Sequence, residues 1–289
     1  MTQSVPGATI LGETVAEIGR ILGADAGGIT IERVVIGLFF TGVKLSTGAA
    51  GAAATPIRSI PEAVCCPSSA LTMPFPGKLR GRPAVDLLKE TVSPHPIRRA
   101  VGVAVMNALA DMCWQRQPDS AVDVRMGVDA YDAAAIRPNE QVVVVGAFVP
   151  FLRALKQAGQ VFTILEIDPR TLKPDEMPYF RPAGQASSVV PMADVVLMTG
   201  TTLLNDSLEG LLALCRPDAR VVVVGPTVSL LPGALLRRGV DVLGGVRVTA
   251  PDEFLDVLSE GGSGYHFFGR SAEKVVLIRR SAKPELKAA

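Results

Sequence analysis

Histidine, cysteine and aromatic residues are scarce in this sequence, and the scarcity excludes several kinds of chemistry. Only two of its 289 residues are histidines, His95 and His266, and four are cysteines. Soft divalent metal ions prefer imidazole and thiolate ligands, but neither histidine has a cysteine or a second histidine at ligand spacing. The sequence therefore excludes a histidine-rich metal site and disfavours a histidine-based catalytic triad. It assigns no catalytic residue, no metal ligand and no cofactor.

The four cysteines form no pair of the CxxC type. They are Cys65, Cys66, Cys113 and Cys215, and the run Cys65-Cys66-Pro67 matches no common zinc-binding spacing. We interpret them as small buried hydrophobic side chains in a reducing compartment. This interpretation favours a cytoplasmic protein.

The sequence also lacks an excess of charge and a long apolar run. Its 29 basic and 28 acidic residues give a net charge of +1, which offers nothing to hold a phosphate backbone or an anionic membrane. No apolar run approaches the roughly 20 residues that span a bilayer, and Glu13 and Glu17 interrupt the first apolar segment. We expect a soluble globular protein with no nucleic-acid partner and no membrane insertion.

The first 118 residues combine helical and strand patterns. The tract from 46 to 55 (STGAAGAAAT) consists of small residues. We interpret it as a close-packed strand or turn, because alanine and glycine let another backbone approach; a low-complexity linker is the alternative. The other expected elements are helices at 14–22, 84–92 and 96–114, strand signals at 29–40 and 41–45, and proline-rich irregular chain at 56–83.

From residue 139 onward, short valine-rich runs alternate with helical patterns, which indicates a parallel sheet covered on both faces. We therefore predict an α/β protein with a smaller α+β domain at 1–118 and a Rossmann-like domain at 119–289. The charged stretch 115–139 is the expected junction. The predicted strands are 141–145, 161–167, 195–198, 220–224, 240–243 and 274–278, with helices at 150–158, 204–215, 232–238 and from 251 to about 261.

Three of these strands end in turns that contain glycine or several polar residues. The turns are Gly146-Ala-Phe-Val-Pro150, Thr199-Gly-Thr-Thr-Leu-Leu-Asn205 and Gly225-Pro-Thr227. Open α/β sheets bind ligands in the crevice outside the carboxyl ends of their strands. The pattern predicts that the three turns, far apart in sequence, converge on one ligand cleft.

The second turn carries more polar groups than a helix start needs. Thr199, Gly200, Thr201, Thr202 and Asn205 supply hydroxyl, amide and backbone groups to a carboxylate, phosphate or metallophore oxygen. Capping is the alternative, since threonine and asparagine satisfy free N–H groups at helix starts. We favour a ligand role for these five residues.

The other two turns are expected to contribute close backbone approach to a ligand and an apolar wall. The Gly225-Pro226-Thr227 turn is either part of the site or only a tight turn. The turn from Gly146 to Pro150 departs from the glycine-rich phosphate fingerprint, which argues against an ordinary NAD enzyme. Phe148 and Pro150 suit a planar ligand such as a pterin, flavin or catechol, whereas a core phenylalanine is the alternative.

Three further residues are candidates for ligand binding. Glu166 ends a predicted strand where Rossmann proteins place an acid for a ribose hydroxyl. Lys44 could neutralise an anionic ligand, although a solvated lysine is the commoner case. Asn107 lies midway through an apolar helix, so its amide needs partners either in the strands of the first domain or in the ligand.

These motifs resemble the putative heavy-metal-chelation family, a microbial family that joins an enolase amino-terminal-like domain to a Rossmann-like domain. The resemblance implies a ligand site at the interface of the two domains and a link to metal or metallophore metabolism. The residues that carry it are TGTT at 199–202 with Asn205, GPT at 225–227, Gly146 with Phe148 and Pro150, and in the first half 34–51 and 102–109 with Asn107-Ala108.

The leading hypothesis is binding, with or without conversion, of a small oxygen-rich planar or metal-chelating molecule between the two domains. Its partner would be a chelator, a pterin-like compound or a metal complex. The alternative is an enzyme that uses a nucleotide-type cofactor such as S-adenosylmethionine, with Glu166 on the ribose. A third hypothesis is a metal-responsive partner protein, and a homo-oligomer is compatible with the sequence.

Overall fold

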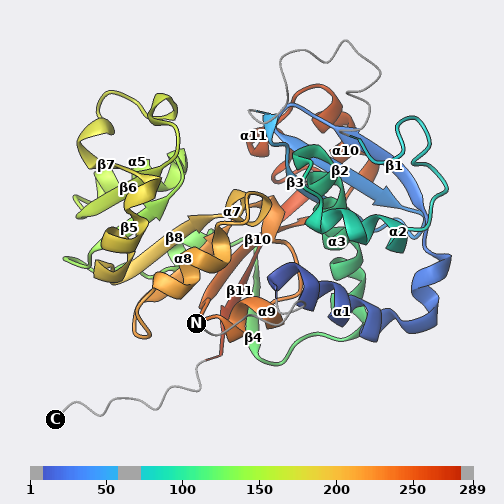
Figure 1. The fold of residues 1–289 in the computed structure, drawn as a ribbon, viewed down its shortest axis with the longest axis horizontal. Coiled ribbons are helices and arrows are strands. Elements are labelled where there is room, and N and C mark those ends of the chain that lie inside the picture. The colour runs from blue at the N-terminus through green and yellow to red at the C-terminus, as the bar shows by residue number, and fades with distance from the viewer. Residues whose placement is uncertain (1–8, 58–72, 281–289) are drawn as a thin grey trace.

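The computed structural model describes residues 9–57 and 73–280 and has the predicted α/β class. A mixed eight-stranded sheet forms the larger part, and a three-stranded antiparallel sheet lies beside it (Figure 1). The smaller sheet comes from the first half of the chain. The label of an enolase amino-terminal-like domain and the boundary after residue 118 stay predictions.

Six parallel strands form the centre of the large sheet, in the order β7-β6-β5-β8-β9-β10. Relative to their order along the chain this is 3-2-1-4-5-6, the Rossmann arrangement, whose direction reverses between β5 and β8. The antiparallel strands β11 and β4 extend the sheet beyond β10. The bounds are β4 Val122–Met126, β5 Val142–Val145, β6 Phe162–Glu166, β7 Phe180–Pro182, β8 Val195–Thr199, β9 Arg220–Val224, β10 Val242–Val248 and β11 Ala272–Arg279.

Helices cover the sheet because the valine-rich strands bury both of their faces; all four residues of β5 are buried, for example. The α-helices of this part are α4 Ala130–Ala133, α5 Val149–Gln157, α6 Ala186–Val189, α7 Thr201–Leu204, α8 Leu208–Leu214, α9 Gly233–Arg237, α10 Pro251–Ser259 and α11 Gly264–Phe267. Short 3₁₀ segments are η5 Pro169–Thr171, η6 Met177–Tyr179, η7 Ala183–Gln185, η8 Val190–Met192 and η9 Pro226–Val228.

Several predicted elements need correction. The expected junction 115–139 contains β4 and α4, and the exposed side chains of this edge strand hid its pattern. The short edge strand β7 was not predicted. The last strand is antiparallel rather than parallel. The helix expected at 204–215 begins only at Leu208, as α8, because Asp206 with its φ of +60° separates it from the preceding helix α7.

The first half of the chain forms a sheet that is packed between two helices (Figure 1). The helix α3 lies against β2 and β3, whereas α10 from the second half of the chain packs against β1 and β2. The bounds are α1 Ile10–Leu22, η1 Gly23–Gly28, β1 Ile31–Ile36, β2 Phe40–Leu45, β3 Ala50–Ala54, α2 Val85–Leu88, η4 Lys89–Val92 and α3 Pro96–Arg116.

The small-residue tract is a close-packed strand, as predicted. A Cβ atom on Gly51 of β3 would lie 2.5 Å from the carbonyl oxygen of Ala104 in α3. On β2, a Cβ atom on Gly42 would lie 2.6 Å from Cδ2 of Leu255 in α10. The absence of side chains at these glycines therefore allows both helices to approach the sheet closely.

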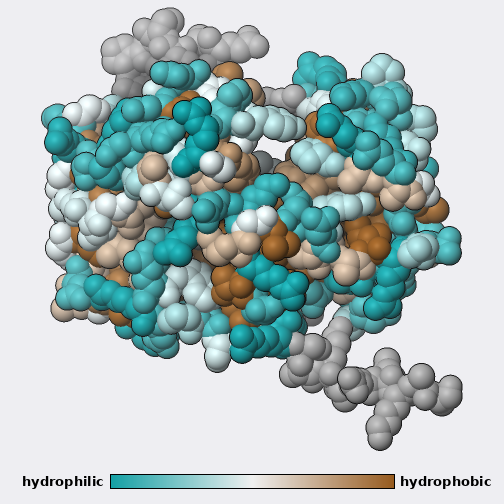
Figure 2. Space-filling model, turned by 180° about the vertical axis from the view of Figure 1, so that it is seen from behind, coloured by the Kyte–Doolittle hydropathy of each residue, from teal (hydrophilic) through white to brown (hydrophobic). Residues whose placement is uncertain are grey.

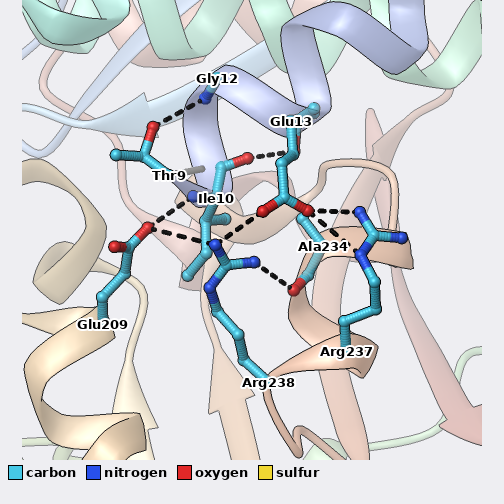
Figure 3. A network of polar contacts seen from close by, with 9 residues as sticks. Thr9, Ile10, Gly12, Glu13, Glu209, Ala234, Arg237 and Arg238 are labelled. Atoms are coloured by element: carbon cyan, nitrogen blue, oxygen red, sulfur yellow. Dashed lines mark hydrogen bonds and ion pairs between the residues drawn. The ribbon is translucent and has the colours of Figure 1, made fainter. Parts of the chain in front are cut away.

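The first helix docks on the second half of the chain through a network of charged groups (Figure 3). The carboxylate of Glu13 accepts hydrogen bonds from Arg237 at 2.5 Å and from Arg238 at 2.7 Å. The backbone N–H of Ile10 donates to Glu209 on α8 at 2.5 Å. Hydrogen bonds from Arg238 and Arg237 hold the pKa of Glu13 below its ordinary value.

We expect Glu13→Gln to lower the free energy of unfolding by about 1 kcal/mol at pH 7, because it removes charge-assisted hydrogen bonds from a partly exposed site. A carboxyl whose pKa is lowered by folding stabilises the fold above its unfolded pKa and loses that contribution as the pH falls through its folded pKa. The difference between variant and parent should therefore shrink below pH 4.5, the ordinary pKa. Urea unfolding of both proteins between pH 7 and pH 4 measures this difference in the free energy of unfolding.

Glu273→Gln on β11 is the matched control, since Glu273 is an exposed glutamate outside this network. It should leave the unfolding free energy within about 0.5 kcal/mol of the parent. A Glu13→Gln effect that did not depend on pH would contradict the ionic account.

Candidate functional site

The three predicted turns lie side by side along the carboxyl edge of the parallel sheet. A Cβ atom on Gly146 would lie 2.7 Å from Cγ2 of Thr199, which brings the turns after β5 and β8 into contact. A Cβ atom on Gly200 would lie 3.2 Å from Cβ of Thr227, which joins the turns after β8 and β9. We call these residues, 146–150, 199–205 and 225–227, the edge turns. They meet at the point where the strand order reverses, the usual ligand position in such sheets.

Two glycines give the edge turns their shape. Gly146 has a φ of +97° and Gly225 a φ of +131°, both in a region that side-chain-bearing residues rarely adopt. At Gly146 a side chain would also collide with Thr199. The backbone conformation therefore explains why glycine occupies both positions, independently of any ligand.

Within the turn after β8, local hydrogen bonds engage several of the polar groups, although no side chain caps the start of α7 or of α8. The hydroxyl of Thr202 is buried and donates to the carbonyl of Thr199 at 2.6 Å. The side-chain oxygen of Asn205 accepts from the hydroxyl of Ser207 at 2.6 Å and from its backbone N–H at 3.2 Å. Thr201 and Asn205 are exposed. The hydroxyl of Thr201 donates to that of Thr199 at 3.3 Å and keeps capacity to accept a hydrogen bond. Through this hydroxyl and the amide nitrogen of Asn205, the exposed residues of the turn can reach a ligand.

Glu166 ties the turn after β5 to the end of β6. One carboxylate oxygen accepts from the N–H of Ala147 at 2.7 Å, and the other accepts from the N–H groups of Ile167 at 2.7 Å and Asp168 at 3.2 Å. Each oxygen has two lone pairs, so the carboxylate holds the loop and keeps some capacity for another donor.

Phe148 is half-buried at the start of α5. Its ring makes an edge contact with Phe151 at 4.5 Å between centroids, and it packs against the core on that side of the sheet. Pro150 is exposed in the first turn of α5. Of the two residues of the predicted apolar wall, Phe148 thus packs partly into the core and Pro150 lies on the surface.

Thr227 and Asn107 connect the edge turns to the smaller sheet. The buried hydroxyl of Thr227 accepts from the N–H of Ala54 at 2.9 Å. The amide nitrogen of Asn107 donates to the carbonyls of Ala52 at 2.8 Å, Pro226 at 3.1 Å and Thr227 at 3.0 Å. These bonds join Asn107 to β3 of the first half of the chain and to η9 of the second, and a ligand role for Asn107 stays a prediction.

Lys44 is not brought to the edge turns. It pairs with Ala50 in the register of β2 and β3, whereas Ala54, at the other end of β3, contacts Thr227. Its amino group lies 2.8 Å from the carboxylates of Asp252 and Glu32. These two groups, Asp252 above all, raise the pKa of Lys44. Lys44 is therefore neither a free anion-binding lysine nor a solvated one, because it forms ion pairs with Glu32 of β1 and Asp252 of α10.

Arg99 on α3 supports the turn after β8, and sequence reasoning did not select it. Its guanidinium donates to the carbonyl of Leu204 at 2.9 Å, lies 2.5 Å from a carboxylate oxygen of Asp206, and donates to the carbonyl of Ser93 at 3.0 Å. The side chain is 11% exposed. A buried arginine needs such partners, but the sequence alone shows only two arginines at a helix start.

The described residues contain no group of three histidine, cysteine, aspartate or glutamate side chains that could hold a metal ion. Burial raises the pKa of Cys113 and of Cys215 to about 11, which keeps both thiols protonated. Cys65 and Cys66 lie outside the described residues. In the described part of the chain the donor set therefore does not fit direct binding of a soft metal ion. No helix there is long and apolar enough to cross a membrane.

The fold and the edge turns define a Rossmann-like α/β protein that carries a second, three-stranded sheet. The chain belongs to the family described as putative heavy-metal chelation: the model of that family matches residues 129–277, and a second model with the same description matches 20–110. This confirms the resemblance noted from the sequence.

Two solved structures of the same family share this fold. A protein of unknown function from Pyrococcus horikoshii superposes with a TM-score of 0.72 at 18% identity, covering 93% of this chain and 99% of that one. One from Desulfitobacterium hafniense gives 0.69 at 20% identity, covering 93% and 98%. An uncharacterized protein of Methanocaldococcus jannaschii is 25% identical over 181 residues, 61% of this chain. The match spans 64% of that relative, less than two thirds of its length.

We expect Arg99→Met to loosen the turn after β8, because Leu204, Asp206 and Ser93 each lose a charged donor. The free energy of unfolding should fall by about 2 kcal/mol, and amide hydrogen exchange should accelerate across residues 199–207. Mass-spectrometric hydrogen exchange measures the second effect.

Arg116→Met, which removes an exposed ion pair between α3 and Asp25, is the matched control. It should change stability by less than about 1 kcal/mol and leave exchange in 199–207 unaltered. Unchanged exchange there in Arg99→Met would contradict the supporting role of Arg99.

Proposed function

We propose that this protein binds a small oxygen-rich molecule, planar or metal-chelating, at the edge turns, within metal or metallophore metabolism. The observation that carries the proposal is the contact of Gly146 with Thr199 and of Gly200 with Thr227. These contacts give three distant turns one lining at the reversal point of the sheet, where such folds bind ligands.

The surface around the edge turns supports this proposal. Figure 2 shows a deep indentation between the part of the molecule that contains β6 and β7 and the remainder. Thr201 and Asn205 supply an exposed hydroxyl and an exposed amide, and the half-buried ring of Phe148 begins the neighbouring helix. Hydroxyl and amide groups suit an oxygen-rich ligand, and a partly exposed ring suits a planar one.

An organic chelator or its metal complex fits these residues better than a bare ion does. Two carboxylates next to the edge turns are already engaged: the oxygens of Glu166 accept three backbone hydrogen bonds, and Asp206 pairs with Arg99. Hard cations take six or more oxygen ligands, which is more than these side chains supply. The metal would therefore arrive with ligands of its own.

A nucleotide-type cofactor such as S-adenosylmethionine is the second candidate. The 3-2-1-4-5-6 strand order and the position of Glu166 at the end of β6 favour it. Against it, the turn after β5 has the sequence Gly146-Ala-Phe-Val-Pro150, in which a proline replaces one of the N–H donors that a phosphate would use.

Calorimetric titration separates the candidates. The probes are 2,3-dihydroxybenzoate, its ferric complex, pterin, ferric citrate, S-adenosylmethionine and NAD. We expect saturable binding of the catechol, its complex or pterin, and at least tenfold weaker binding, about 1.4 kcal/mol, in Thr201→Val and in Asn205→Ala. Thr201→Val removes an exposed hydroxyl and its hydrogen bond to Thr199, and Asn205→Ala removes an exposed amide and its two hydrogen bonds to Ser207; neither residue belongs to the core.

Ser187→Ala removes an exposed hydroxyl from α6 and should leave affinity unchanged. Binding of S-adenosylmethionine or NAD alone would transfer the assignment to the second candidate. If Thr201→Val and Asn205→Ala bound the probe as tightly as the parent does, the edge turns would not be the site.

A further inference from the structure

The two ends of the large sheet differ in how they meet another strand. At one end, β7 has three residues and includes Pro182, which has no N–H to donate. Short edge strands with proline are protected against pairing with another chain. At the other end, β4 has five residues and no proline, and no strand of the described residues pairs with its outer side. We call this side the open edge of β4.

The ladder between β4 and β11 shows which backbone groups point to the open edge. The N–H of Gly127 donates to the carbonyl of Lys274 at 2.9 Å, and the N–H of Arg280 donates to the carbonyl of Ala121 at 2.8 Å. Between these bonds the register has no shift. Because the backbone groups of successive residues point to opposite sides of an antiparallel strand, the odd-numbered residues of β4 face β11. The groups at the open edge belong to Val122, Val124 and Met126.

The same residues give the open edge an apolar face. Val124 is 44% exposed and Met126 is 41% exposed. Both line a hollow together with Trp114, so they lie on the face of the sheet that α3 covers. Exposed apolar side chains beside unpaired backbone groups are the features by which an edge strand accepts another strand.

The opposite face of β4 carries one charge of each sign. Asp123 and Arg125 lie on either side of Val124 and form an exposed ion pair at 3.0 Å. An antiparallel second copy of β4 would bring its Arg125 opposite Asp123 and its Asp123 opposite Arg125. Opposite charges that face each other across two strands stabilise a sheet. The charges of β4 are therefore complementary to those of a second copy.

The backbone and the charges select the same register. When Val124 lies opposite Val124 of the second copy, the two residues form a hydrogen-bonded pair, because both present their backbone groups to the open edge. A register moved by two residues would keep this hydrogen-bond pattern. It would, however, set Asp123 against Asp123 or Arg125 against Arg125, and like charges directly opposite each other destabilise a sheet. The register centred on Val124 satisfies both conditions.

We propose that two copies of this chain pair through β4, antiparallel and centred on Val124, so that their large sheets become one continuous sheet. The partner is a second copy because the charge pattern matches itself. Strands β11, β10 and β9 separate β4 from β8, so the pairing leaves the edge turns open and does not depend on the function proposed for them. Interfaces of this small size are weak, and we expect a dissociation constant on the order of 10 µM.

A charge exchange tests the register. Arg125→Asp should weaken dimerisation at least tenfold, because both cross-strand pairs change from attraction to repulsion. Asp123→Arg should have the same effect. In the chain that carries both substitutions, opposite charges face each other again, and the dissociation constant should return to within about threefold of the parent value. Sedimentation velocity at protein concentrations from about 1 to 200 µM measures the equilibrium around the expected constant.

Val124→Pro tests the backbone pairing. The N–H that it removes faces the open edge, so the ladder with β11 keeps its hydrogen bonds, whereas the dimer loses the bonds at its centre. Dimerisation should be lost. Arg170→Asp is the matched control, since Arg170 forms an exposed ion pair of the same spacing with Asp168, after β6 and towards the opposite end of the sheet. It should dimerise like the parent, and thermal unfolding shows whether each variant folds.

Three results would each overturn the proposal. The first is a parent protein that stays monomeric up to about 200 µM, well above the expected dissociation constant. The second is a dimer that Arg125→Asp and a folded Val124→Pro leave as tight as the parent. The third is a folded double variant that does not regain the affinity lost in the single charge variants.

Discussion

The amide of Asn107 is the contact on which the arrangement of the two sheets depends. Its nitrogen donates to carbonyls in β3 and in η9 at the same time, so that α3, the small sheet and the end of β9 are held at one point. The neighbouring hydrogen bond from Ala54 to Thr227 adds a second link. Because the groups are buried, losing a partner would leave polar atoms unsatisfied. The position of the edge turns relative to α3 follows from this contact.

The two halves of the chain also share their core. One buried apolar cluster contains Leu45 and Ala108 from the first half and Leu230 and Leu243 from the second. In addition α10, which belongs to the second half, covers a face of the small sheet. The small sheet is thus enclosed by both halves, and its glycines at 42 and 51 allow the two helices to approach it closely.

Much of the fold could be predicted from local patterns in the sequence. The valine-rich strands and the alternating helices predicted the parallel sheet, and the run of alanine and glycine predicted the close contact of β3 with α3. The strands β4 and β7 were not predicted, because edge strands expose side chains and lose the apolar pattern. The direction of β11 depends on its pairing with β10, which no local pattern records.

The candidate site was predictable to a similar degree. That the edge turns lie together followed from their places at the ends of predicted parallel strands, but their hydrogen bonds could not be predicted in this way. The side-chain oxygens of Asn205 and Glu166 accept hydrogen bonds from backbone N–H groups. Lys44 pairs with Asp252, and Arg99 contacts Leu204, which lies 105 residues further along the chain. Tertiary packing determines these hydrogen-bond and ion-pair partners, so they cannot be predicted from the residue types alone.

The helix α3 forms one continuous element. Arg99 near its start contacts the turn after β8, and Asp111, twelve residues later and about 18 Å along the axis, pairs with Arg247 of β10. A continuous helix moves as one body. Loosening the contacts of Arg99 would therefore also disturb the contact of Asp111 with the large sheet.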